Sequence, residues 1–421
     1  MLTFIVVCGN GIAAWSQEAN PSRAPTPAAP TTPTLQVGPS PIDAATQPGF
    51  SEATDQNLLA PPRTNNRRPA RTSPVSTSRN TSRYNSAFSP RLARAAPIMG
   101  DSFAPTLAFQ DELGLAVNEF PQGGGATRSK IAENSSSLPM DRYIFNYNYF
   151  RNAIDDSPYS SSSVDRFTLG FEKTFLDQMM SVEVRMPFVA DNDFVSTDFV
   201  RNGSDVGNLS VTLKGVLTSN ADSLLAAGLT IDTPTGGGSV LTINNVVDQL
   251  IVDVSNDAVH LSPFLGFLYA PRGINTHQGF LQIDVPTNAN AMQFRDVSGV
   301  ATTELLEQTL LYVDYSFSRQ LYHAGRGAQS SHGIRRILGL AELHYTTTLE
   351  DSDVVLSGTT SNPLFEVTSA GNRLDVVNIT LGLHTELNNG TQLRLGTVAP
   401  ITNDDDRFFD FEFQAQLNIP L

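Results

Sequence analysis

The last thirteen residues of the chain alternate strictly between apolar and polar side chains. The apolar set is Phe409, Phe411, Phe413, Ala415, Leu417, Ile419 and Leu421, and the intervening set is Asp410, Glu412, Gln414, Gln416, Asn418 and Pro420. A period of two places one set on each face of a β-strand. At roughly 3.3 Å per residue the segment spans about 43 Å, whereas ordinary strands have about five or six residues. The pattern therefore predicts a strand long enough to cross a bilayer.

Eleven earlier segments show similar alternation. The twelve predicted strands are 142–150, 164–175, 179–188, 206–217, 223–233, 258–269, 278–287, 307–318, 336–347, 375–387, 391–401 and 408–420. The gaps between them are mostly short and long in turn, and the long ones are 151–163, 189–205, 234–257, 288–306 and 348–374. Short periplasmic turns that alternate with longer outer loops are typical of bacterial barrels. We therefore predict an all-β fold, an antiparallel transmembrane β-barrel of about 12 strands over residues 142–421.

A soluble secreted β-sandwich also alternates, so it remains an alternative. The length of the strands, the alternating gap lengths and the charged side chains of the second face all favour the barrel. Only 16% of the residues are charged, against 40% apolar.

The N-terminus has the features of an export signal. Residues 1–16 form a short apolar run that ends in small residues, with Ala14 and Ser16 placed for cleavage before Gln17. Cys8, the only cysteine, would leave with this signal peptide, so the mature chain would hold no disulfide and no cysteine nucleophile. These features predict export to the bacterial outer membrane.

Residues 17–100 are rich in Pro, Ser, Thr, Ala and Arg and predict a disordered tail. The tail is basic, whereas residues 101–421 carry 18 basic and 38 acidic side chains. Its arginines either contact anionic cell wall or lipid, or lie in a solvated spacer. A nucleic-acid partner is not expected. Residues 101–141 form either a plug inside the barrel or a lead-in to it.

Residues 203–236 resemble a known family. The matching elements are Asp205-Val206-Gly207, Lys214, the run 225–229 and Pro234-Thr235-Gly236. They resemble a hairpin of the outer-membrane transporter-like barrels known as putative meta-pathway phenol-degradation proteins, which are distantly similar to long-chain fatty-acid transporters. The resemblance implies a transporter-like barrel. Leu421 departs from the aromatic final residue that usually marks chains for outer-membrane assembly.

The sequence shows no convincing catalytic or metal-binding pattern. The six histidines lack metal-ligand spacing, and Ser330, Ser331 and His332 lack a third catalytic group. Asp404-Asp405-Asp406 is either a solvated loop tip or a calcium site, and the first interpretation is favoured. We expect no enzyme activity, no metal and no cofactor.

The polar face of the strands is the stronger candidate for function. The residues expected to line the lumen are Glu183, Arg185, Lys214, Glu342, His344, Arg394 and Glu412. Mixed charges suit a selective constriction, and the leading hypothesis is a channel for passive movement of small solutes, apolar ones included. The alternative is a non-conducting barrel that ties outer-membrane lipid to the cell wall through the basic tail.

Overall fold

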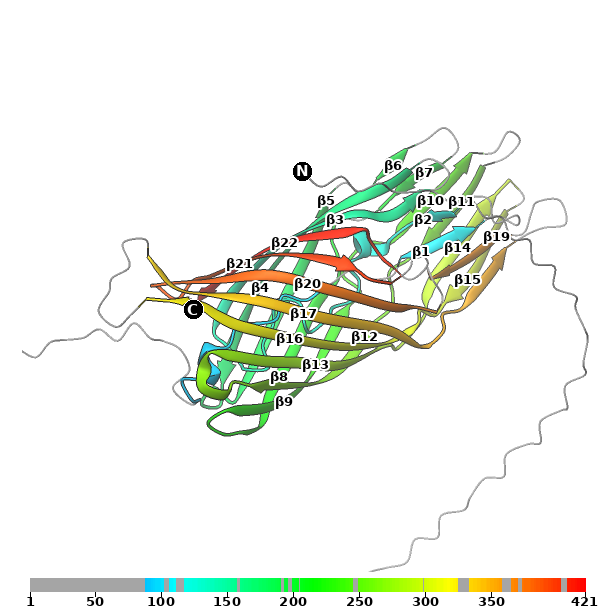
Figure 1. The fold of residues 1–421 in the computed structure, drawn as a ribbon. Coiled ribbons are helices and arrows are strands. Elements are labelled where there is room, and N and C mark those ends of the chain that lie inside the picture. Colours follow the sequence, from blue (N-terminus) through cyan, green and yellow to red (C-terminus); the bar gives the residue numbers. More distant parts are fainter. Residues whose placement is uncertain are drawn as a thin grey trace, which may run out of the picture. The chain divides into compact units, whose positions relative to one another are not determined.

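A computed structural model describes residues 88–101, 106–110, 117–156, 160–190, 193–195, 199–203, 205–244, 249–297, 299–324, 333–357, 365–369, 373–402 and 407–421. Twelve strands form one closed antiparallel barrel (Figure 1). They are β3 (Arg142–Asp156), β4 (Ser160–Phe175), β5 (Met180–Ala190), β8 (Leu209–Ser219), β9 (Ser223–Thr233), β12 (His260–Tyr269), β13 (Asn275–Pro286), β16 (Thr309–His323), β17 (Ile334–Glu350), β20 (Asp375–Leu387), β21 (Gln392–Pro400) and β22 (Phe411–Pro420). Pairing of β22 with β3 closes the ring, so the barrel has no free edge.

The predicted twelve-stranded barrel is confirmed, strand by strand. Two predicted strands, 223–233 and 375–387, match β9 and β20 at both ends. Most other strands are longer than predicted, and β16 and β17 shorten the gap predicted at 319–335 to residues 324–333.

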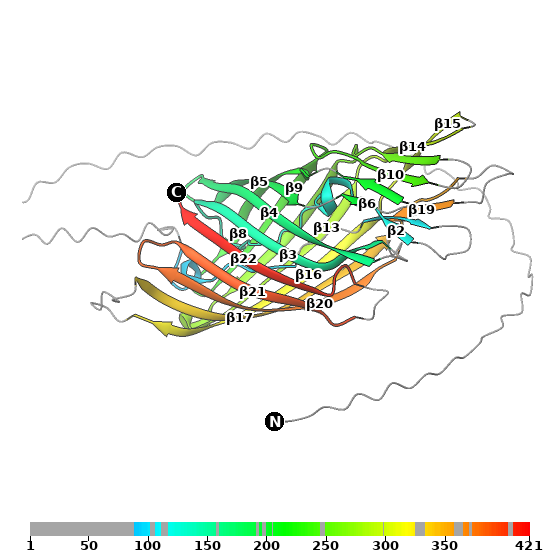
Figure 2. The same cartoon turned by 90° about the horizontal axis from the view of Figure 1, so that it is seen from above.

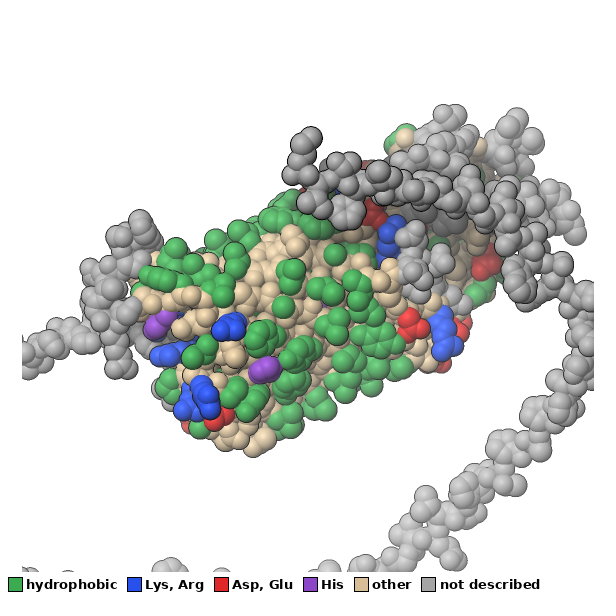
Figure 3. All heavy atoms as spheres, viewed as in Figure 1, with side chains coloured by type: hydrophobic (Ala, Val, Ile, Leu, Met, Phe, Trp, Pro, Cys, Tyr) green, Lys and Arg blue, Asp and Glu red, His purple; other side chains and the backbone are tan. Residues whose placement is uncertain are grey.

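The two faces of the barrel wall have opposite chemistry. Along β13, β16 and β22 the outward residues Leu281, Val313 and Phe413 are 45%, 39% and 36% exposed. Their polar neighbours in the sequence, among them Gln282 and Asp314, are buried. Figure 3 shows the apolar side chains spread over the outer wall. A soluble sandwich would bury the apolar face instead, so that alternative is wrong. The protein is an outer-membrane β-barrel.

The barrel has a turn end and a loop end. Short connections at 176–179, 220–222, 270–274 and 388–391 define the turn end, where the C-terminus also lies (Figures 1 and 2). The long connections define the loop end. In bacterial barrels short turns face the periplasm, which orients the molecule.

The long connections at the loop end were predicted as loops, and for much of their length this is wrong. They contain β6 (Phe194–Val195), β7 (Phe199–Asn202), β10 (Ser239–Asn244), β11 (Gln249–Val254), β14 (Asn290–Asp296) and β15 (Gly299–Leu305), which form a sheet of their own, and also β18 (Val354–Ser357) and β19 (Phe365–Ser369). These strands are too short to span a bilayer: β10 has six residues. A sequence pattern chosen to find spanning strands therefore assigns them to loops.

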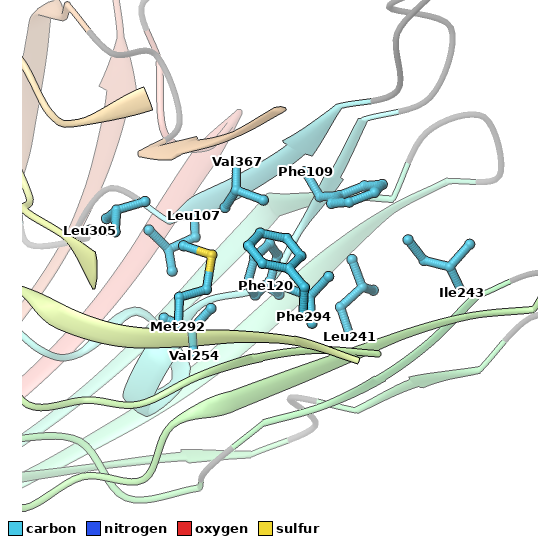
Figure 4. Close-up of a cluster of buried hydrophobic side chains, with 11 residues drawn as sticks. Leu107, Phe109, Phe120, Leu241, Ile243, Val254, Met292, Phe294, Leu305 and Val367 are labelled. Atoms are coloured by element: carbon cyan, nitrogen blue, oxygen red, sulfur yellow. The ribbon is translucent and has the colours of Figure 1, made fainter. Parts of the chain in front are cut away.

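A hydrophobic core lies at the loop end, and we call it the cap. It is made by β10, β11 and β14 on one side and by β1 (Leu107–Gln110), Phe120 and β19 on the other (Figure 4). β1 pairs with both β19 and β2 (Val117–Glu119). The side chains of Leu107, Phe109 and Phe120 are at most 3% exposed. The N-terminal segment therefore completes the core of the cap.

The described chain begins at Phe88, so the prediction of a disordered tail over residues 17–100 is wrong for residues 88–100. Residues 95–100 are all buried, because they lie inside the barrel against its inner wall. The signal peptide predicted at 1–16 lies outside the described residues. Within the described part of the chain, no helix is long and apolar enough to cross a membrane.

Candidate functional site

The N-terminal segment passes through the barrel twice. It starts at the turn end, where Arg91 forms an ion pair with Asp222 and the Ser89 hydroxyl donates to the Ala221 carbonyl. Residues 95–101, which we call the first leg, run towards the loop end and are followed there by β1 and β2. Residues 126–140, the second leg, return to the start of β3. We call the two legs together the plug.

The two legs contact each other in the lumen. The Ile98 N–H donates to the Ser135 carbonyl over 2.7 Å, and the Asn134 N–H donates to the Met99 carbonyl over 3.0 Å. Side chains from all around the wall bind one leg or the other, so the described residues fill the interior along its length.

A charged cluster holds the second leg near the loop end. Arg128 lies 2.7 Å from Glu307 and 3.2 Å from Asp284, and all three side chains are buried. Burial raises the pKa of Glu307, but the charges of Arg128 and His260 outweigh burial and hold it below its ordinary value of 4.5. Glu307 follows β15 rather than lying in a spanning strand, so this cluster ties the plug to a loop.

A second cluster joins both legs in the middle of the lumen. Lys130 of the second leg lies 2.5 Å from Asp101 of the first leg and 2.9 Å from Asp314 on β16. Asp101, Asp314 and His344 are close enough together to hold a metal ion. Both carboxylates lie within ion-pair distance of the Lys130 ammonium group and of Nδ1 of His344, so side chains of the protein itself already contact them.

Asp314, His344 and Thr380 form a hydrogen-bonded row that resembles a catalytic triad. Nδ1 of His344 is 2.7 Å from Asp314, and Nε2 is 3.1 Å from the Thr380 hydroxyl. Thr380 is paired with β17 and β21 through the sheet, so its surrounding backbone N–H groups are used in the ladder. The row therefore lies within the hydrogen-bonded wall of the barrel.

The third cluster lies near the turn end. Glu172 accepts from Arg142 over 2.8 Å and pairs with Lys214 over 2.9 Å, while Glu183 pairs with Arg142 and Arg185. Every one of these side chains belongs to the wall. They surround Asn134 of the second leg, and Arg185 donates to the carbonyls of Glu133 and Asn134.

Asn134 anchors the second leg. It is fully buried with φ +44°, a left-handed conformation that asparagine adopts more readily than most residues. Its side-chain oxygen accepts from Arg142 over 3.1 Å and also from Arg394. The asparagine amide therefore occupies a position between two wall arginines.

The first leg is held mainly through its backbone. Glu342 accepts from the N–H groups of Met99 and Gly100, each over 3.0 Å. Gln414 and Gln416 donate to the carbonyls of Gly100 and Met99 over 2.7 and 2.9 Å. The wall thus binds an extended main chain, with Asp101 as the one ionised side chain of this leg.

Room for the first leg comes from a pair of glycines opposite each other on β20 and β21. Gly382 pairs with Gly396, and a Cβ on Gly396 would lie 2.6 Å from Cε of Met99. Any larger residue there would push the leg away from the wall.

All seven residues predicted to line the lumen are buried on the inner face. The structure places them in separate groups rather than in one site. Glu183, Arg185 and Lys214 belong to the turn-end cluster, Glu342 and His344 to the middle one, and Arg394 donates to the carbonyl of Pro97 over 3.1 Å. Glu412 accepts from Asn148 and Gln414.

The residues of the family motif lie where the chain enters the second leg. A Cβ on Gly207 would lie 2.5 Å from the Ala126 carbonyl oxygen, so only glycine allows this approach. The Gly236 N–H donates to the side chain of Asn208 over 3.0 Å, and the hydroxyl of Thr235 accepts from the Leu209 N–H over 2.7 Å. Asp205 and Pro234 are exposed. The motif is a structural support for the plug.

Comparison with known proteins gives matches among solved structures only. No family model and no curated protein matches the sequence. An outer-membrane channel from Pseudomonas putida F1 is 11% identical, with a TM-score of 0.41 over 68% of this chain and 97% of that one. The toluene transporter TbuX of Ralstonia pickettii is 9% identical, with a TM-score of 0.32 over 79% and 96%. The NanC porin is 6% identical, with a TM-score of 0.36 over 67% and 100%.

Four functional residues of the plug escaped sequence analysis: Arg128, Lys130, Glu133 and Asn134. They lie in a polar stretch without periodicity, since wall side chains surround the second leg on all sides and no face needs to be apolar. The one available signal was the group of charged residues Arg128, Lys130 and Glu133 in an otherwise uncharged loop sequence. The Asp404–Asp406 and Ser330–His332 candidates lie outside the described residues.

Proposed function

We propose that the barrel is a channel for passive movement of small polar solutes, and that its own plug keeps it closed. The observation that carries this proposal is the way the first leg is bound, through main-chain hydrogen bonds to polar wall side chains. Water can replace such hydrogen bonds at small net cost. Release of the first leg would therefore leave polar wall side chains in contact with water.

The chemistry of the wall supports polar solutes over apolar ones. Glu342, Arg394, Gln414 and Gln416 would face the lumen once the first leg has left. Apolar inner-wall side chains such as Phe264 and Leu340 form small separate patches against Ile98 and Met99. A hydrocarbon would have to desolvate the charged groups between these patches, at considerable cost.

Opening by the first leg alone is the simplest route. This leg has one ionised side chain, Asp101, whereas the second leg has Arg128, Lys130 and Glu133 in ion pairs. The second leg also continues directly into β3, which belongs to the barrel wall. The first leg is therefore held by fewer charges and is less constrained by the chain.

Substitution of Asp101 tests this proposal. Asp101→Lys would place a positive charge beside Lys130 and His344, while the wall stays unchanged. We expect the variant to conduct in planar bilayers at least about tenfold more often than the parent, because like charges in a buried site repel strongly. Asp253→Lys, an exposed site on β11, is the matched control and should behave like the parent.

Heat-modifiable gel mobility shows whether each variant is folded. A folded Asp101→Lys barrel that stays as silent as the parent would contradict the channel proposal. It would favour the second candidate, a non-conducting barrel that links the outer membrane to the cell wall. The filled lumen supports that candidate, and co-sedimentation of the full chain with purified cell-wall sacculi tests it.

We also infer a non-enzymatic role. Most charged groups of the described lumen pair with one another or with the plug, and Thr380 of the Asp314–His344–Thr380 row lies on a strand paired on both sides. No cofactor is proposed.

A further inference from the structure

The described basic side chains that are exposed or partly exposed at the turn end fall into two groups. Arg91, Lys173 and Arg335 each lie within ion-pair distance of a carboxylate, respectively that of Asp222, Asp141 and Glu386. Arg94, Arg272 and Arg319 are exposed and form no ion pair with a carboxylate among the described residues. Arg94 lies in the N-terminal segment, whereas Arg272 and Arg319 belong to the elements of the barrel wall. Two unneutralised guanidinium groups at the rim of the barrel call for a separate explanation.

These two arginines belong to adjacent elements. Arg272 lies in the turn η3 (Pro271–Gly273), which joins β12 to β13. Arg319 on β16 is the cross-strand partner of Asn275 at the start of β13, and the Gln320 N–H donates to the Ile274 carbonyl over 2.9 Å. The fold therefore brings both guanidinium groups to one sector of the rim.

An aromatic group lies directly beside them on the outer wall. The His277 ring is 6.1 Å from Tyr269, 6.2 Å from Tyr315 and 5.3 Å from Phe317, measured between ring centres. Nδ1 of His277 is 2.7 Å from the Tyr315 hydroxyl. Aromatic girdles with polar tips mark the level of lipid head groups on membrane barrels.

The acidic residue beside this sector at the turn end is Asp222, whose carbonyl accepts from the Ala270 N–H and whose carboxylate already pairs with Arg91. The outward residues of β12, β13 and β16 on the way to the loop end are apolar, for example Leu265, Leu281 and Val313. Figure 3 shows basic and histidine side chains near the turn end of this face, next to the apolar wall. A ligand bound here would contact positive charge at the rim and the apolar outer wall next to it.

The conformation of Arg272 supports a role for its side chain. It has φ +63°, a region that glycine or asparagine adopts more easily than arginine. A residue with an unusual backbone conformation is a candidate for function when its charged side chain forms no ion pair within the protein.

We propose that Arg272 and Arg319 bind the phosphate of an anionic phospholipid of the periplasmic leaflet. The two guanidinium groups would contact the phosphate, the Tyr269–His277–Tyr315 group would lie at the glycerol level, and the acyl chains would follow the apolar wall of β12, β13 and β16. Arginine suits phosphate because its planar donors bind two oxygens at once. The short turns place this rim in the periplasmic leaflet.

Native mass spectrometry of the full-length protein in detergent tests the proposal. Phosphatidylglycerol, phosphatidylcholine and lipid A would be added separately at equal concentration. We expect retention of phosphatidylglycerol at least fivefold above phosphatidylcholine, and loss of that preference in the double variant Arg272→Gln/Arg319→Gln. Lys173→Gln, at an exposed and paired site on β4, is the control and should keep it.

Both substituted side chains are exposed, and heat-modifiable mobility checks that the variants remain folded. If a variant fails to fold, the salt dependence of the parent protein provides the test. In 0.5 M NaCl the parent should lose its preference for phosphatidylglycerol. Equal retention of the two phospholipids by the parent would overturn the proposal, as would unchanged preference in the folded double variant. Stronger retention of lipid A than of phosphatidylglycerol would also overturn it, because it would assign the site to the outer leaflet.

Discussion

The cap and the lumen hold the same N-terminal segment by opposite means. In the cap, Leu107, Phe109 and Phe120 pack into a hydrophobic core with side chains of β10, β11, β14 and β19. In the lumen, the legs on either side of that core are bound by ion pairs and main-chain hydrogen bonds. Hydrophobic contacts lose their stabilisation when water enters, whereas polar contacts can exchange with water. The difference indicates a firmly attached cap and a first leg suited to release.

The largest effect is expected in the cap. Phe120→Ala removes a fully buried ring and should cost about 3–5 kcal/mol of local stability. Hydrogen exchange of the β10 and β11 amides should accelerate more than about a hundredfold, while the barrel keeps its heat-modifiable mobility. Phe411→Ala, on the lipid-facing wall and 37% exposed, is the matched control and should have a much smaller effect. Equal effects of both substitutions would remove the distinction between cap and wall.

A smaller effect is expected in the turn-end cluster. Glu172→Gln keeps the shape of the side chain but leaves Arg142 and Lys214 without one of their charged partners. Removal of one member of a buried pair costs about 3 kcal/mol, and here Glu183 still compensates Arg142. We expect the urea midpoint of barrel unfolding to fall. Glu350→Gln, at an exposed position of β17, should leave it unchanged, and an equal fall would show that the buried cluster has no special role.

The smallest effect is expected from a change of pH, acting on the Arg128–Glu307 pair near the loop end. The pKa of Glu307 is lowered in the folded protein, so its pairing with Arg128 stabilises the plug fully above pH 4.5 and is lost as pH falls through the lower folded value. Channel openings should therefore become more frequent as the pH falls below 4.5 through the lowered pKa of Glu307, by on the order of 1 kcal/mol in the opening equilibrium. Glu307→Gln should abolish this acid response. An unchanged response in that variant would assign it to other groups.

The barrel was predictable from the sequence because its signal is periodic and long. Each spanning strand must keep one apolar face towards lipid, so alternation persists over nine or more residues, as in β22. The inward direction of Glu183, Arg185 and Lys214 followed from the same period.

The plug and the cap were not predictable in the same way. The second leg contacts polar wall side chains around Asn134 and a small apolar patch at Ile131 and Phe264, so its sequence shows no periodic apolar face. The strands of the cap are short, and one of the two partners of β1 is β19, more than 250 residues away in the chain. Which of the lumen-facing residues contact the plug depends on such long-range pairing, and no local pattern encodes it.

Hydrogen–deuterium exchange of residues 95–101 in the full-length, detergent-solubilised protein tests the central claim most directly. If the first leg lies in the lumen, the amides of Ile98, Met99 and Gly100 should exchange at least about a hundredfold more slowly than an unprotected peptide, because Ser135 and Glu342 accept their hydrogen bonds. Asp101→Lys should remove that protection while the β13 and β16 amides remain protected. Exchange of residues 95–101 at the unprotected rate in the parent would contradict a closed lumen.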